Sequence, residues 1–155
     1  MPLEPAMNSS ILHHQQLAAI LKTLMIPGGI QLRAWQEADF PAIQRLTAQQ
    51  GWPTPTTRPA EALLGWRHSW PALVVIEGEE VIGFVRGLTD GEITTYIAEL
   101  LVDPRYQRRG LGHLLIEACH ALYPHTRLDV IAEAVPFYKR EGFRELGPGM
   151  RKSFR

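Results

Sequence analysis

The sequence predicts one mixed α/β (α+β type) domain built on a central, mostly antiparallel sheet. Its 155 residues, 45% hydrophobic and 21% charged, have the length and composition of a single globular domain rather than of a disordered or fibrous chain. The turn pairs Gly78-Glu79 and Asp90-Gly91 separate three apolar runs, which predicts consecutive antiparallel strands. After Asp103-Pro104 the apolar residues change to helical spacing before another strand, which predicts a parallel strand-helix-strand crossover.

The segment before the first strand predicts a helix from about residue 10 to 25. Ser9 or Ser10 can cap it, and Pro27-Gly28-Gly29 follows its expected end. Its apolar stripe must cover either the chain's own domain or a second subunit, so a homodimer is one expectation. The stripe consists of Leu17, Ile20, Leu21 and Leu24.

The remaining elements follow from the same patterns of spacing and turn residues. The stretch from Gly51 to Pro59 is too rich in proline, threonine and glycine for regular structure, and we expect a mobile surface loop there. Strands are expected at 30–35, 73–77, 80–88, 93–102, 126–130, 143–146 and 150–154, a twisted sheet of about six to seven strands. Further helices are expected at 39–49, 60–66, 111–122 and 132–140.

Charge and cysteine content narrow the class of protein. The formal net charge is zero, which argues against a nucleic-acid-coating protein, and the basic clusters at 105–109 and 139–155 suit a small anion better. A single cysteine, Cys119, excludes an intramolecular disulfide, and we expect an inert structural thiol. We see neither a membrane span nor a leader segment, so we expect a soluble cytoplasmic protein with no membrane partner.

The stretch YQRRGLGHLL, Tyr106 to Leu115, predicts an anion site. Two arginines precede Gly-Leu-Gly at the start of a helix, where unpaired N–H groups and the helix dipole favour a phosphate. A Walker loop is excluded because no Gly-Lys-Ser/Thr ending is present. A dinucleotide fingerprint is disfavoured because Leu115 stands where its third glycine belongs.

A second motif, AVPFYKREGF from Ala134 to Phe143, lies one helix and one strand downstream. Together with LLVDPRYQRRGLG, Leu100 to Gly112, it resembles the GNAT superfamily of N-acetyltransferases. The likeness covers about Ile30 to Phe154, which implies an N-terminal extension at 1–29 and a GNAT domain, of the acyl-CoA N-acyltransferase fold, at 30–155. The position where many members carry an asparagine is Ile131 here, so the contacts of that asparagine are not carried over.

The resemblance implies acetyl-CoA as co-substrate. Its pyrophosphate would lie against the N–H groups of residues 108–113, and its pantetheine amides would pair with a strand edge. The implied coenzyme-binding residues are Leu100, Leu101, Val102, Arg108, Arg109, Gly110, Leu111, Gly112 and His113. No metal is implied, and the histidines lack the spacing of helical metal ligands, since His113 and His120 are seven apart.

The resemblance also implies direct acetyl transfer to a primary amine. Tyr138 matches the tyrosine that protonates the departing thiolate in many members. An amine of pKa about 10.4 must lose a proton, for which Glu99 is the first candidate base, Asp129 the second, and a water relay a third. The main alternative is a catalytically silent acyl-CoA sensor or interaction module of the same fold.

The acceptor is left open between a small molecule and a peptide. An open acidic groove beside Glu99 would favour a peptide. A closed aromatic pocket near Trp52 would favour a small amine. Variable loops determine such specificity, so the sequence does not decide between the two.

Overall fold

The computed structural model describes residues 5–153, and its centre is a five-stranded sheet in the order β1-β2-β3-β4-β5. The first four strands are antiparallel neighbours, and β5 runs parallel to β4, as the predicted crossover requires. The strands are β1 (Ile30–Ala34), β2 (Ala72–Glu77), β3 (Glu80–Thr89), β4 (Thr94–Val102) and β5 (Arg127–Val130).

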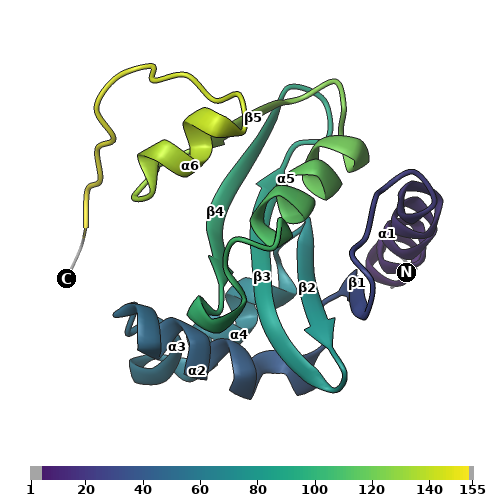
Figure 1. Cartoon of the computed structure of the whole chain (residues 1–155), viewed down its shortest axis with the longest axis horizontal. Helices are drawn as coiled ribbons and strands as arrows, with labels where there is room; N and C mark the ends of the chain where they lie inside the picture. The colour runs from purple at the N-terminus through teal and green to yellow at the C-terminus, as the bar shows by residue number, and fades with distance from the viewer. Residues whose placement is uncertain (1–4, 154–155) are drawn as a thin grey trace.

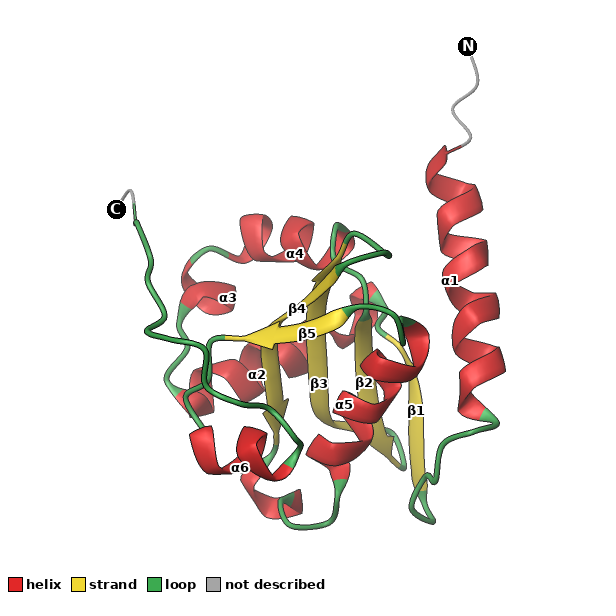
Figure 2. Cartoon of the chain, turned by 90° about the horizontal axis from the view of Figure 1, so that it is seen from above, coloured by secondary structure: helices red, strands yellow, loops and turns green. Residues whose placement is uncertain are grey.

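Helices cover both faces of this sheet (Figures 1 and 2). One face carries α5, with α1 beside it, and the other carries α2 and the short helices that follow it. The helices are α1 (Pro5–Leu21), α2 (Phe40–Gln50), α3 (Thr54–Thr57), α4 (Pro59–Arg67), α5 (Leu111–Leu122) and α6 (Val135–Arg140), with 3-10 turns η1 (Glu37–Asp39) and η2 (Pro104–Tyr106).

Strand β2 shows why the sheet is covered on both sides. Its residues from Ala72 to Ile76 are all buried, an unbroken apolar run rather than an alternating one. Because successive side chains of a strand point to opposite faces, Leu73 and Val75 belong to the core under α5, and Val74 belongs to the core under α2. The two cores fix the sheet from which the site is built.

Helix α1 covers the chain's own domain. Leu17 is 4% exposed in the core under α5, and the rest of the predicted stripe packs around it. The helix ends at Leu21 rather than near residue 25, and the ring of His13 stacks on Trp70 with centroids 4.3 Å apart.

Within the described residues, no helix is long and apolar enough to cross a membrane.

The expectation of six to seven strands is wrong, because the sheet ends at β5. Neither 143–146 nor 150–153 is a strand, and Phe154 lies outside the described residues. The Leu146 side chain is 75% exposed and that of Met150 86%, so neither finds an apolar surface to pack against. Strand propensity without such packing is weak, and Pro148 between the two segments cannot donate to a ladder.

The stretch from Gly51 to Pro59, expected to be irregular, contains the one-turn helix α3. Its prolines lie in the first turn or ahead of it, where a missing N–H costs no hydrogen bond. The Pro53 carbonyl accepts from the N–H of Thr56 at 3.0 Å and of Thr57 at 2.9 Å. Buried Pro55 fixes this turn against the body of the protein.

Candidate active site

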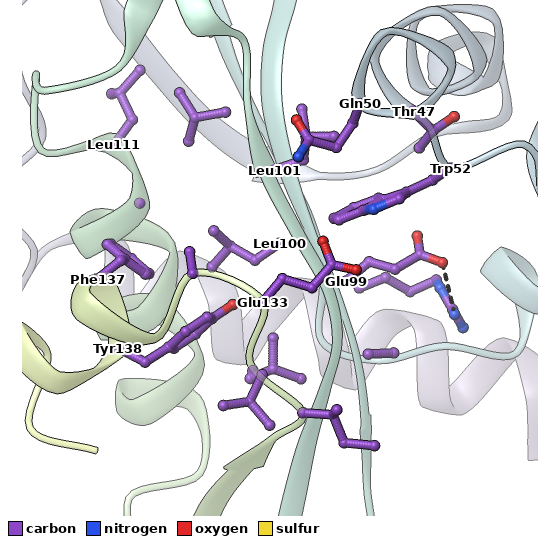
Figure 3. Close-up of a pocket in the computed structure, with 18 of the residues that line it drawn as sticks. Thr47, Gln50, Trp52, Glu99, Leu100, Leu101, Leu111, Glu133, Phe137 and Tyr138 are labelled. Carbon is purple, nitrogen blue, oxygen red and sulfur yellow. Dashed lines mark hydrogen bonds and ion pairs between the residues drawn. The ribbon is translucent and has the colours of Figure 1, made fainter. Parts of the chain in front are cut away.

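A groove of about 960 Å³ opens where β4 and β5 separate. The two strands pair only over the first part of β4, from Thr94 to Ile97, so the remainder of β4 has no strand neighbour on this side. Side chains from β4, the loop before α5, α6 and the α2–α3 connection line the groove (Figure 3). Residues distant in the sequence therefore meet at one exposed strand edge.

The free edge of β4 presents backbone groups of alternate residues. The N–H of Asp103 donates to the Ile82 carbonyl at 2.8 Å, toward β3. Strand alternation then turns the backbone groups of Leu101 toward β3 and those of Leu100 and Val102 toward the gap. All three sequence-predicted residues line the groove, but only Leu100 and Val102 offer backbone groups to a ligand there.

Two local features modify this edge. The side-chain amide of Gln107 donates to the Val102 carbonyl at 3.1 Å, so that acceptor is already engaged. Arg86 lies opposite Glu99 while Gly87 lies opposite Ile97, which makes the residue between Ile97 and Glu99 a β-bulge. A bulge bends its strand and re-aims its side chains, here at the point where Glu99 enters the groove.

The N-terminus of α5 faces the groove without a cap. Gly110 precedes the helix with a φ of 78°, a left-handed conformation that favours glycine, and no side chain caps this end. The first helical hydrogen bond is from the Leu114 N–H to the Gly110 carbonyl at 2.9 Å. The N–H groups of Leu111, Gly112 and His113 therefore lack helical partners, as an anion site requires.

The two arginines before this helix point to different places. Arg108 lines the groove and has a φ of 66°, the only positive value of a non-glycine residue in the described part of the chain. Arg109 does not line the groove. Its guanidinium lies 5.0 Å from the Tyr106 ring centroid and 3.7 Å from the Glu77 carboxylate. The structure therefore does not bring the predicted side-chain charge of Arg109 to the groove.

His113 joins the helix start to the end of α6. Its ring Nδ1 lies 2.8 Å from Oε1 of Glu141, whose side chain is only 10% exposed. That hydrogen bond is the main reason why the pKa of His113 is raised, against an opposing effect of desolvation. The pair ties the start of α5, with its free N–H groups, to the end of α6, which carries Tyr138.

Tyr138 is buried on α6 and also lines the groove. The rings of Phe137 and Phe143 contact it edge-on, with centroids 4.9 and 5.3 Å away. Burial first, and then the negative charge of Glu133, raise the pKa of Tyr138 to about 12. Its hydroxyl is therefore protonated at neutral pH and can serve as a proton donor.

Glu99 on β4 also lines the groove and is held by a cation. Its Oε1 accepts a hydrogen bond from Arg86 at 3.1 Å, and Arg86 also donates to the Ser69 hydroxyl at 3.2 Å. The second carboxylate oxygen, Oε2, is buried and has no hydrogen-bond partner among the described residues. A buried oxygen without a partner is costly, so this atom is suited to accept a proton or a hydrogen bond from a bound substrate.

One predicted carboxylate lies outside the groove, and one that was not predicted lies inside it. Asp129 lines a separate cavity of about 1040 Å³ beside α6, and its Oδ2 lies 3.5 Å from Nε of Arg127. It is not brought together with Glu99. Glu133, which sequence reasoning missed, points into the groove between Tyr138 and Glu99 (Figure 3). No sequence signal marked it, because it lies on the short connection between β5 and α6.

The structure also places the tryptophan and the cysteine that the sequence singled out. Trp52 lines the groove from the α2–α3 connection (Figure 3). Cys119 is fully buried, and burial raises the pKa of its thiol to about 12, as an inert cysteine requires. In the described part of the chain, no group of three or more His, Cys, Asp or Glu residues is placed to hold a metal ion.

Known proteins resemble this chain in sequence and in fold. A family model described as an acetyltransferase (GNAT) domain matches residues 68–145. A protein of Glycine max called a histone acetyltransferase is 30% identical over 132 residues, covering 76% of this chain and 57% of that protein. This chain thus spans little more than half the length of that curated relative.

Solved structures of acetyltransferases share the fold of this chain. A GNAT-family acetyltransferase of Streptococcus pneumoniae superposes with a TM-score of 0.68 at 24% identity, covering 81% of this chain and 98% of the other. A structure from Deinococcus radiodurans, described as a putative acetyltransferase, gives a TM-score of 0.65 at 26% identity, covering 83% and 92%. The shared architecture extends over most of both chains in each comparison.

Proposed function

Because the chain belongs to the GNAT family of acetyltransferases, we propose that it transfers the acetyl group of acetyl-CoA to a primary amine, with both substrates bound at once. One observation carries this proposal: a free strand edge, an uncapped helix N-terminus and a buried, protonated tyrosine line the same groove. These are the three features that an acyl-CoA thioester needs, since it has amides, a pyrophosphate and a thiolate leaving group.

The coenzyme would use groups that the protein leaves free. The backbone of Leu100 and the N–H of Val102 would pair with the pantetheine amides. The N–H groups of Leu111, Gly112 and His113 would bind the pyrophosphate. This placement puts the thioester between α6 and the β-bulge of β4, within the part of the groove that Tyr138 and Glu99 line.

The chemistry then assigns one role to Glu99 and another to Tyr138. The amine nitrogen attacks the thioester carbonyl, its C–N bond forms, and the C–S bond breaks. We propose that the ammonium group first gives one proton to Glu99, whose Oε2 has no partner in the described structure, so that the nitrogen attacks as a neutral amine. The Tyr138 hydroxyl gives its proton to the departing thiolate and regains one from the second proton that the nitrogen loses as the amide forms. A thiolate of pKa about 8.5 is a fair leaving group, so the base matters more than the acid.

The test is release of free thiol from acetyl-CoA in the presence of an amine panel. The panel includes small aliphatic and aromatic amines and a lysine-containing histone peptide, since the Glycine max relative is called a histone acetyltransferase. We expect amine-dependent release in the native protein. The Tyr138→Phe variant should lower kcat by about 10- to 100-fold while leaving the KM for acetyl-CoA near its original value.

If the protein bound acetyl-CoA but released no thiol with any amine, the proposed acetyltransferase activity would be contradicted. That result would identify an acyl-CoA-binding module of the same fold. Glu79→Gln is a suitable control, because Glu79 is exposed in the β2–β3 turn and does not line the groove. It should leave both kcat and KM unchanged.

A further inference from the structure

Glu133 differs from the other two carboxylates that line the groove, Glu99 and Glu141, in being free, since Glu141 is paired with His113. Glu133 makes no hydrogen bond or ion pair to another described residue, whereas Glu99 is paired with Arg86. Its side chain is exposed and points from the β5–α6 connection toward Glu99 across the mouth of the groove (Figure 3). Its charge also acts on the hydroxyl of Tyr138. Glu133 therefore provides an uncompensated negative charge next to the place where the acyl group would react.

Apolar side chains also line the groove into which this carboxylate points. Trp52 lines the same groove as Glu99 and Glu133, and Figure 3 draws all three side chains. The groove is also lined by Leu88, 44% exposed, and by Ile131, 50% exposed. Large apolar side chains left open to water inside a groove indicate a ligand with an apolar body.

The groove is otherwise lined by Glu141, which is paired with His113, and by several arginines, among them Arg108. Arg86 lies behind Glu99, and Arg140 and Arg151 also line the groove. A ligand with several ammonium groups would therefore meet one free carboxylate and several guanidinium groups. The electrostatics favour a single positive charge on the acceptor.

We propose that Glu133 binds the ammonium group of the acceptor, and that the acceptor is a monocationic primary amine carried on a flat apolar or aromatic body that packs on Trp52. This inference rests on the proposed function and refines its acceptor. Glu133, exposed to water, recruits the cation. Glu99, with a buried oxygen, takes the proton. Glu133 thus contributes to the KM for the amine, and Glu99 contributes to kcat.

The first test compares Glu133→Gln with Glu79→Gln, using 2-phenylethylamine as acceptor. Loss of the charge-assisted contact should raise the KM for this amine roughly tenfold, with kcat within about twofold of the native value. Glu79→Gln should change neither constant. Circular dichroism and the melting temperature verify that both variants fold. An unchanged KM in Glu133→Gln, or a loss confined to kcat, overturns the assignment of Glu133.

The second test examines the apolar body. Trp52→Ala should raise the KM for 2-phenylethylamine roughly tenfold, and leave the KM for ethylamine within about twofold. Spermidine, which carries several charges, should be a poorer acceptor than 2-phenylethylamine in the native protein. Equal effects of Trp52→Ala on both monoamines, or a preference for spermidine, would overturn the proposed substrate class.

A binding measurement separates this inference from the proposed function. Titration calorimetry of 2-phenylethylamine into the CoA-saturated native protein should show binding that weakens roughly tenfold in Glu133→Gln. If the native protein releases no thiol with any amine but this difference is found, the enzyme proposal fails and the assignment of Glu133 stands. If amines are acetylated but Glu133→Gln binds 2-phenylethylamine as the native protein does, only the assignment of Glu133 fails.

Discussion

Gly112 in α5 and Phe137 in α6 are in direct contact, and the contact depends on the missing side chain. A Cβ at position 112 would lie 2.9 Å from both Cε2 and Cζ of the Phe137 ring. The second glycine of the Gly-Leu-Gly stretch therefore allows α6 to pack on the helix start, in addition to any role in anion binding. We expect Gly112→Ala to cost about 1–3 kcal/mol of stability, measured by denaturant unfolding. It should also raise the KM for acetyl-CoA.

Gly65 is the matched control for this substitution. It lies inside α4, and a Cβ there would meet nothing within 4 Å. Gly65→Ala should therefore be neutral or stabilise the protein by up to about 1 kcal/mol, because alanine is the better helix former. Equal destabilisation by Gly65→Ala and Gly112→Ala would show that the ring contact is not the cause.

The two arginines of the loop before α5 should differ in their effect on coenzyme binding. Arg108 lines the groove, whereas the guanidinium of Arg109 lies near the Tyr106 ring and Glu77. Arg108→Gln should raise the KM for acetyl-CoA by about tenfold, the value of one charge-assisted hydrogen bond. Arg109→Gln should change it by less than about twofold. The opposite order in steady-state kinetics would contradict the orientation of these side chains.

Stability should depend on pH through the pair of His113 and Glu141. The pKa of His113 is raised by its hydrogen bond to Glu141. The pair therefore stabilises the fold fully below the ordinary histidine pKa of about 6.5, and this contribution is lost as the pH rises through the folded-state pKa. The His113 side chain is 61% exposed, which limits the contribution to less than about 1 kcal/mol.

Melting temperatures check this dependence. His113→Gln should lower the melting temperature relative to the native protein at pH 5.5, and the difference should vanish at pH 9. A difference of the same size at both pH values would mean that His113 acts through packing rather than through its charge.

The thiol of Cys119 should be unreactive in the folded protein. It is fully buried, and burial raises its pKa to about 12, so almost no thiolate is present at neutral pH. A thiol reagent should modify the native protein very slowly and the urea-unfolded protein rapidly, as followed by mass spectrometry. Rapid modification of the native protein would disprove the burial.

The sequence was sufficient for the parts of the fold that strong periodicity and turn chemistry specify. The turns at Gly78 and Asp90 and the change of period after Pro104 predicted strands β2 to β5 and helix α5 in the correct order. The predictions were wrong where tertiary contacts decide. In the segment 143–146, Phe143 packs on Tyr138 while Leu146 is left exposed, so the segment joins no strand of the sheet.

For the candidate site, predictions about backbone groups were more reliable than predictions about the directions of side chains. A Gly-rich helix start and a strand edge are visible in a sequence, and the structure brings both to one groove. The directions of side chains are not visible in this way, which is why Arg109 points away from the groove and Glu133 was missed. Glu133 lines the groove from the short β5–α6 connection (Figure 3).

The location of bound acetyl-CoA is the most direct test of the central claim, which is that the coenzyme occupies the gap between β4 and β5. The measurement is a crystal structure of the native protein with the coenzyme. We expect the pyrophosphate at the N–H groups of Leu111, Gly112 and His113, the pantetheine along Leu100 and Val102, and the sulfur nearest to Tyr138. Coenzyme in the cavity beside Asp129, with the β4–β5 gap empty, would contradict the account.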